Sequence, residues 1–233
     1  MNDSSATLKG EHPYFPPSAV LPGYAVNTMD AATLVACFVA GSGAILTTAY
    51  TIISRARPGL ARSDILAALW FVLCGFIHFF FEGYFAFNYD NMPAQLDLFG
   101  QLWKEYSLSD SRYLTQDSFV VTMEAATAIF WGPLSFLCAL FIVMDHPLRH
   151  PLQLIISLGQ MYGDVLYYAT ATFAVRVEGV DYCRPESFYF WWYYFLCNAF
   201  WIVIPFALIV QSVAKTRAAF VAMQAAAKTK KGQ

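Results

Sequence analysis

Charged residues are scarce in this chain of 233 residues, at 13% against roughly 25% in an average soluble domain. So few charges could not cover a soluble protein, because 58% of the residues are hydrophobic and the mean hydropathy is +0.47. The net charge is −2 and no basic stripe runs among the aromatic residues, which argues against nucleic acid as a partner. The composition therefore predicts an integral membrane protein.

Paired metal-ligand spacings are missing among the five cysteines, and all but Cys183 lie in apolar runs, so we interpret them as packing residues. The first thirty residues lack an apolar core behind a basic start, which predicts that no signal peptide is cleaved. The chain also lacks a glycine-rich phosphate loop. What it does contain is a series of long apolar runs.

Five apolar runs are long enough to cross roughly 30 Å of hydrocarbon. We therefore expect an all-α integral membrane protein with a five-helix transmembrane bundle at residues 31–213, between a tail at 1–30 and a basic tail at 214–233. A short amphipathic helix is expected at the membrane interface over residues 94–106. The predicted spans are residues 31–53, 65–87, 119–144, 152–173 and 188–213.

The two tails differ in composition. Residues 12–17 combine proline with aromatic residues, which fits either an extended segment against the membrane surface or a loose terminus. Five spans place nine lysines and arginines on the C-terminal side and five on the other, which predicts a cytosolic C-terminus. The end, Lys230-Lys231-Gly232-Gln233, resembles a dilysine retrieval signal and predicts the endoplasmic-reticulum membrane.

Polar residues inside the spans occur in pairs at helical spacing. Residues three or four apart share one face of a helix, so each pair is expected to face a common interior. Titratable groups in a membrane span are costly and are candidates for function. The pairs are His78 with Glu82, Glu124 with Thr127, Gln160 with Asp164, and Asn198 with Trp201.

Structural roles compete with functional ones at these positions. We interpret Gln160 and Asp164 as structural, with Asp164 closing a polar network with Arg112 or Tyr167, and Asn198 alone is typical of a contact between helices. His78, Glu82 and Glu124 could bind a metal, but the spacings typical of metal ligands do not accompany them. Two carboxyl groups and an imidazole suit proton transfer instead, and the Trp201 indole suits a transient cation. This set predicts protonation of a lipid alkene followed by loss of a proton elsewhere.

Several longer motifs contain these polar residues. They are Cys74-Gly75-Phe76-Ile77-His78-x-x-x-Glu82-Gly83, Gln101-Leu102-Trp103-Lys104-Glu105-Tyr106, Asp110-Ser111-Arg112-Tyr113, Met123-Glu124-x-x-Thr127, Trp131-Gly132-Pro133-Leu134-Ser135, His146-Pro147-Leu148-Arg149, Gly159-Gln160-x-Tyr162-Gly163-Asp164 and Asn198-Ala199-x-Trp201. In these motifs, in order over most of residues 75–205, the chain resembles the emopamil-binding protein family, the 3β-hydroxysteroid Δ8,Δ7-isomerases of the EXPERA superfamily.

The resemblance implies a membrane enzyme of the endoplasmic reticulum with an intramembrane sterol cavity and no cofactor. It would move the C8=C9 double bond to C7=C8 through a carbocation. The implied catalytic residues are His78, Glu82 and Glu124, and the implied substrate-binding residues are Thr127, Asn198 and Trp201. The implied partners are a sterol and membrane lipid. Cationic amphipathic amines, whose ammonium group stands in for the carbocation, and a second copy of the chain are further candidates.

Two other functions stay open at this point. A sterol- or amine-binding EXPERA protein without catalysis would keep the same cavity. An isomerase of another polycyclic terpenoid would use the same acid and base groups on a different carbon skeleton. The apolar packing around the cavity decides between skeletons, and sequence patterns do not reveal it.

Overall fold

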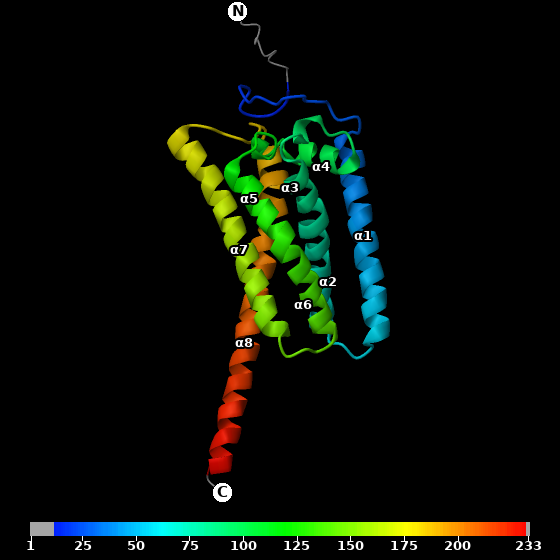
Figure 1. Cartoon of the computed structure of the whole chain (residues 1–233), viewed down its shortest axis with the longest axis vertical. Helices are drawn as coiled ribbons and strands as arrows, with labels where there is room; N and C mark the ends of the chain where they lie inside the picture. The colour runs from blue at the N-terminus through cyan, green and yellow to red at the C-terminus, as the bar shows by residue number, and fades with distance from the viewer. Residues whose placement is uncertain (1–11, 232–233) are drawn as a thin grey trace, which may run out of the picture.

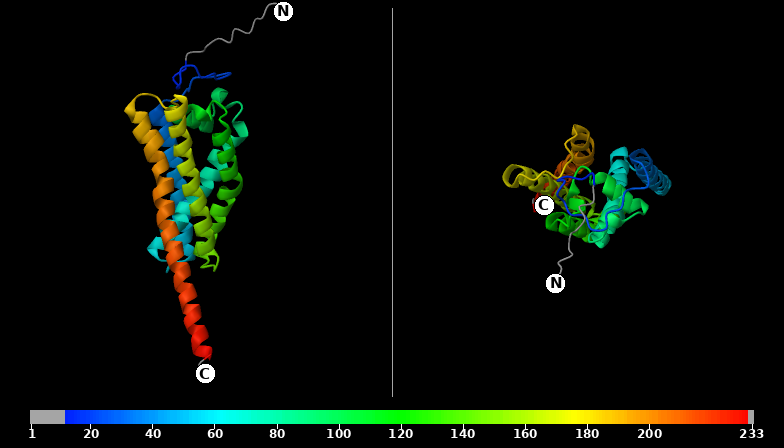
Figure 2. Two further views of the ribbon diagram at one scale, coloured as in Figure 1. Left: turned by 90° about the vertical axis from the view of Figure 1, so that its left-hand side faces the viewer. Right: turned by 90° about the horizontal axis from the view of Figure 1, so that it is seen from above.

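A computed structural model of the chain describes residues 12–231 and contains helices but no strand within that range. Five long helical rods run up and down beside one another (Figures 1 and 2), as the sequence predicts. The helices are α1 (Ala31–Ala56), α2 (Arg62–Phe76), α3 (Gly83–Asn88), α4 (Leu98–Tyr106), α5 (Ser118–Ala126), α6 (Gly132–Val143), α7 (Arg149–Phe173) and α8 (Cys197–Lys231).

Two of the rods are α-helices joined without a break by π-helical turns. The segment Ile77–Glu82 connects α2 to α3, and Thr127–Trp131 connects α5 to α6. Pro133 lies in the first turn of α6, directly after one of these π-helical turns. Such π-helical turns occur frequently at functional sites.

Four rods within the described range are long and apolar enough to cross a membrane by length and composition. They are α1, the rod α2–α3, the rod α5–α6, and α8 with the π-helical turn Tyr189–Leu196 before it. The fifth rod, α7, is 25 residues long and carries more polar residues, and it packs closely along α8. The chain is thus a multi-pass membrane protein.

Aspartates begin three of the helices. The Asp30 carboxylate accepts from Thr33 N (2.9 Å) at α1, Asp97 caps α4 and Asp117 caps α5. Each satisfies backbone N–H groups that a helix leaves unpaired, and its charge suits the positive end of the helix dipole. The predicted interface helix is therefore shorter than expected, because the Asp97 cap starts it at Leu98.

Residues 12–30 lie across α4 and the loops at one end of the bundle. Tyr14 is buried, the Lys104 ammonium donates to Ala25 O (2.6 Å), and Gln101 Oε1 accepts from Thr28 N (2.8 Å). The described part of the N-terminal tail is therefore not a loose terminus. It covers the protein's own cap, which we define as residues 89–117.

Two apolar clusters occupy opposite ends of the bundle. One lies under the cap and is mainly aromatic, with Phe85, Trp103 and Tyr167, and the other contains Phe71 and Ile156. At the far end α8 continues beyond the predicted span, to Lys231, and projects from the bundle as an exposed arm (Figure 1). The polar residues of the spans lie between the two clusters.

Candidate functional site

A cavity of about 730 Å³ lies within the bundle, inside the roughly 300–1,000 Å³ typical of small-molecule sites. Aromatic and aliphatic side chains from α1, α2, α4, α7 and α8 form most of its wall. The cavity collects every residue that the sequence predicts for the site, namely His78, Glu82, Glu124, Thr127, Asn198 and Trp201.

His78 and Glu82 form an ion-pair geometry inside the π-helical turn. His78 Nδ1 lies 2.7 Å from Glu82 Oε2, and His78 is buried. The turn itself exists where another helix comes unusually close, because a Cβ on Gly132 would lie 2.9 Å from Phe79 N. The missing side chain at Gly132 lets the two irregular turns touch, which places Glu82 against the α5–α6 rod.

Thr127 connects the two glutamates. Its hydroxyl donates to Glu82 Oε2 (2.5 Å) and lies 3.5 Å from Glu124 Oε2. Glu124 receives a second donor, the Tyr113 hydroxyl, at 2.6 Å from Oε1. One imidazole and two carboxyl groups are therefore joined into a continuous hydrogen-bonded cluster within an apolar cavity.

The other face of His78 contacts α7. Gln160 Nε2 lies 3.0 Å from His78 Nε2, so the amide donates to the ring and Nδ1 carries the proton that reaches Glu82. Turning the amide around would present its oxygen instead, which suits a doubly protonated ring. The Gln160 side chain can thus serve both protonation states of His78. Because both ring nitrogens are occupied, the imidazole has no lone pair directed at a metal.

Aromatic groups close the cavity near His78. The Trp201 ring lies 6.3 Å from the His78 ring and 5.5 Å from the Trp70 ring, measured between centroids. Asn198 donates to the Tyr106 hydroxyl (2.8 Å) and to Tyr194 O (2.6 Å). Asn198 therefore joins helices, as its structural interpretation holds, and it also lines the cavity.

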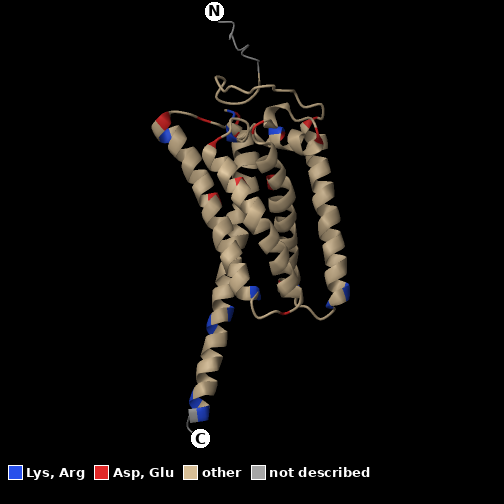
Figure 3. Cartoon of the chain, viewed as in Figure 1, with Lys and Arg blue, Asp and Glu red and all other residues tan. Residues whose placement is uncertain are grey.

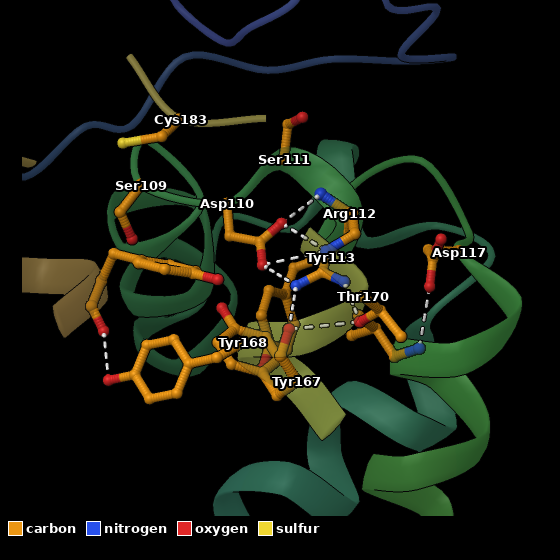
Figure 4. Close-up of polar contacts among 12 residues, drawn as sticks. Ser109, Asp110, Ser111, Arg112, Tyr113, Asp117, Tyr167, Tyr168, Thr170 and Cys183 are labelled. Carbon is orange, nitrogen blue, oxygen red and sulfur yellow. Dashed lines mark hydrogen bonds and ion pairs between the residues drawn. The ribbon is translucent and has the colours of Figure 1, made fainter. Parts of the chain in front are cut away.

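The cap holds Tyr113 in place through a buried ion pair (Figure 4). Arg112 Nη2 lies 2.7 Å from Asp110 Oδ2, and Arg112 also donates to Thr170 Oγ1 (2.8 Å) on α7. Burial opposes the charge of Arg112, but the Asp110 carboxylate beside it outweighs burial and raises the pKa of the guanidinium. Burial raises the pKa of Tyr113 well above its usual range, so its phenol stays a neutral donor.

The structural role expected for Asp164 is wrong. Arg112 is held by Asp110, and Asp164 Oδ2 is buried without a hydrogen-bond partner among the described residues. Gln160, expected to be structural with it, contacts His78 directly. Tyr113 is the functional candidate that sequence reasoning missed. Its only signal is its place in the motif Asp110-Ser111-Arg112-Tyr113.

The family model described as EXPERA (EXPanded EBP superfamily) matches residues 98–212. A 3-beta-hydroxysteroid-Delta(8),Delta(7)-isomerase from Mus musculus is 37% identical over 204 residues, which cover 87% of each chain. The enzyme of the same name from Cavia porcellus is 36% identical over the same length and the same share of each chain.

One relative with a different named activity is less similar than these two isomerases. A protoglabretal synthase from Citrus sinensis is 34% identical over 158 residues, which cover 66% of this chain and 71% of the synthase. The alignment with the isomerases is thus longer and slightly closer than that with this synthase.

Proposed function

This chain belongs to the EXPERA superfamily, and on that premise we propose that it is a sterol Δ8,Δ7-isomerase. The observation that carries the proposal is the identity of 36–37% with two Δ8,Δ7-isomerases over 87% of the chain. The hydrogen-bonded cluster of His78, Glu82 and Glu124 in an apolar cavity supports it. A sterol is almost wholly apolar, and most of the side chains that form the wall of the cavity are apolar as well.

The reaction needs one proton donor and one proton acceptor. Addition of a proton to C9 uses the electrons of the C8=C9 bond and leaves a tertiary cation at C8. Loss of the proton from C7 then supplies the electrons of the new C7=C8 bond, so the formula is unchanged. We assign proton delivery to His78 with Glu82, the complementary acid–base role to Glu124, and stabilisation of the cation to the Trp201 face.

Glu82→Gln and Glu124→Gln test this mechanism. Each substitution keeps the shape of the side chain and removes a carboxyl group, so each should lower conversion of a Δ8 to a Δ7 sterol by at least about 100-fold. The measurement is sterol profiling in yeast that lacks its own Δ8,Δ7-isomerase. Glu178→Gln, on an exposed residue, is the matched control and should keep full activity. Full activity in both cavity variants would refute the mechanism.

Deuterated water separates the isomerase from a protein that only binds sterols. A solvent-exchangeable acid should place deuterium in the Δ7 product, whereas a binding protein yields no product. The terpenoid isomerase is the second candidate, since a protoglabretal synthase is 34% identical. If the protein is a terpenoid isomerase, it should convert a triterpenoid substrate and convert little of the Δ8 sterol.

The proposal extends to the compartment and to ligands. An endoplasmic-reticulum location with a cytosolic C-terminus is supported by the dilysine-like end, of which Gly232 and Gln233 lie outside the described residues. Cationic amphipathic amines should compete with the sterol, because an ammonium group resembles the carbocation between the two glutamates. Binding of a labelled amine that weakens in Glu124→Gln membranes relative to Glu178→Gln membranes is the expected result.

A further inference from the structure

Asp164 is one of two carboxyl groups of the cavity that the acid–base cluster does not use, and the other, Glu105, accepts a hydrogen bond from the Tyr193 hydroxyl (2.9 Å). Asp164 lines the cavity from α7, is 9% exposed, and its Oδ2 has no hydrogen-bond partner among the described residues. The nearest candidates for a countercharge are occupied, since Arg112 is paired with Asp110 and Lys104 donates to Ala25 O. A buried polar group without a partner costs free energy, so a site that retains one is a candidate for binding a polar ligand group.

The position of Asp164 follows from the packing of α7 on α8. The helices run antiparallel, and their register is fixed by bonds from Gln153 Nε2 to Leu208 O (3.1 Å) and from the Tyr168 hydroxyl to Phe195 O (2.8 Å). This register places Asp164 at the level of Asn198. Gln160, which contacts His78, lies four residues before Asp164 on α7, a rise of about 6 Å. Asp164 therefore lies about one turn closer to the cap than the contact between Gln160 and His78. Glu82 is displaced from His78 in the same direction, because α7 and the α2–α3 rod both run toward the cap (Figure 1).

We propose that Asp164 accepts a hydrogen bond from the 3β-hydroxyl group of the sterol. This inference rests on the proposed function. The hydroxyl lies on ring A, which is fused to the reacting ring B, so a polar anchor is needed one ring away from the proton carriers. The hydroxyl is the single polar group of such a sterol, and burying it without an acceptor would cost binding energy. A carboxyl group offers that acceptor in either protonation state.

Another pair of unpartnered groups lies elsewhere in the cavity. The indole nitrogens of Trp70 and Trp201 are buried without partners among the described residues. Indoles only donate, so they would leave the hydrogen of the hydroxyl group unpaired. Two unpartnered acceptors of the cavity could satisfy this hydrogen, Asp164 Oδ2 and Gln160 Oε1. The Gln160 amide is already bonded to His78, which favours Asp164 as the anchor and makes Trp70 the natural comparison.

The proposed hydrogen bond from the sterol hydroxyl to Asp164 is tested by assaying three proteins on two substrates. Wild type, Asp164→Leu and Asp164→Asn are assayed in yeast membranes with a Δ8 3β-hydroxysterol and with its 3-deoxy analogue. We expect Asp164→Leu to lower kcat/KM for the hydroxysterol by about 10–100-fold and to change that for the analogue by less than about threefold. Asp164→Asn keeps an acceptor oxygen and should lose less. The Trp70→Phe variant should keep the preference for the hydroxysterol.

The outcomes separate the anchor from the proposed function. Equal losses on both substrates would overturn the anchor and point to a role in the chemistry or in folding. Loss of the hydroxysterol preference in Trp70→Phe with its retention in Asp164→Leu would move the anchor to the indoles. If the wild type fails to convert the hydroxysterol at all, the proposed function itself fails. If wild type converts it with no preference for the hydroxyl group, only the anchor fails.

Discussion

At the scale of single residues, the two glutamates of the cavity have different partners. Glu82 Oε2 accepts hydrogen bonds from the His78 ring nitrogen and from the Thr127 hydroxyl, which suits an ionised carboxylate. Glu124 receives one short bond, from the Tyr113 phenol, at Oε1. Its other oxygen lies 3.5 Å from the Thr127 hydroxyl and is free to accept a proton. Different surroundings of this kind let two similar groups take opposite roles in proton transfer.

Tyr113→Phe removes one donor from Glu124 and keeps the aromatic packing under the cap. A hydrogen bond to a charged group contributes about 1.5–3 kcal/mol, so we expect kcat to fall by about 10–100-fold with little change in thermal stability. Sterol turnover in membranes and a thermal unfolding curve of the purified protein measure the two quantities. Tyr89→Phe, on an exposed residue, is the matched control. Unchanged kcat in Tyr113→Phe would remove this phenol from the mechanism.

Spacing along single helices was sufficient to predict which residues of each span face inward. It could not show that Tyr113 reaches Glu124, because a loop residue comes into contact only after the cap folds over the bundle. Asp164 illustrates the same limit. The sequence contains an arginine of the right charge, Arg112, but the nearer Asp110 takes it. Which partner a buried charge finds depends on tertiary distances, and spacing in the sequence does not contain them.

At the scale of helices, the close approach of α7 to the α5–α6 rod shapes the site. A Cβ on Gly159 of α7 would lie 2.1 Å from the Trp131 indole, and that indole is fixed by a bond from Nε1 to Ile156 O (3.1 Å). The Gly159 position therefore lets Trp131 lie against α7 next to Gln160. The contact helps hold the α5–α6 rod, which carries Glu124, against the helix that carries Gln160.

Gly159→Ala should therefore destabilise the protein. Alanine favours a helix by up to about 1 kcal/mol over glycine, but overpacking costs about 1–3 kcal/mol, and the rigid indole has little room to move. We expect a lower Tm in detergent and weaker sterol turnover. Gly41→Ala in α1 is the control, because no atom lies within 4 Å of its added Cβ. A Tm for Gly159→Ala equal to that of Gly41→Ala would contradict the packing argument.

The ends of the rods follow from the sequence to within a few residues, because apolar length and aspartate caps determine them. The π-helical turns do not follow from the sequence. The run at Ile77–Glu82 is typical of an ordinary apolar helix, and its π-helical turn packs against Gly132 of the α5–α6 rod. The helix α8 also extends beyond its apolar span. Hydropathy ends a span near Val213, whereas alanine-rich sequence continues the helix to Lys231.

At the scale of the whole molecule, basic residues are unevenly distributed along the bundle. They gather at the end that holds the exposed arm of α8 and the loops between α1 and α2 and between α6 and α7 (Figure 3). The cap end carries acidic residues as well as basic ones. By the positive-inside rule, this asymmetry supports the proposed orientation, in which the arm faces the cytosol and the cap faces the lumen. The cavity, closer to the cap than to the arm, would then lie toward the lumenal half of the membrane.

Glycosylation tests this orientation. The chain contains an acceptor sequence, Asn2-Asp3-Ser4, on the side expected to be lumenal. Full-length protein made in microsomes should carry a glycan that a glycosidase removes and that Asn2→Gln abolishes. The paired change Gln224→Asn with Ala226→Thr creates an acceptor in the arm and should stay unmodified, because the modifying enzyme works only in the lumen. A glycan on the arm, with none on Asn2, would invert the orientation. The lysines at the end would then face the lumen, where a cytosolic retrieval signal has no receptor.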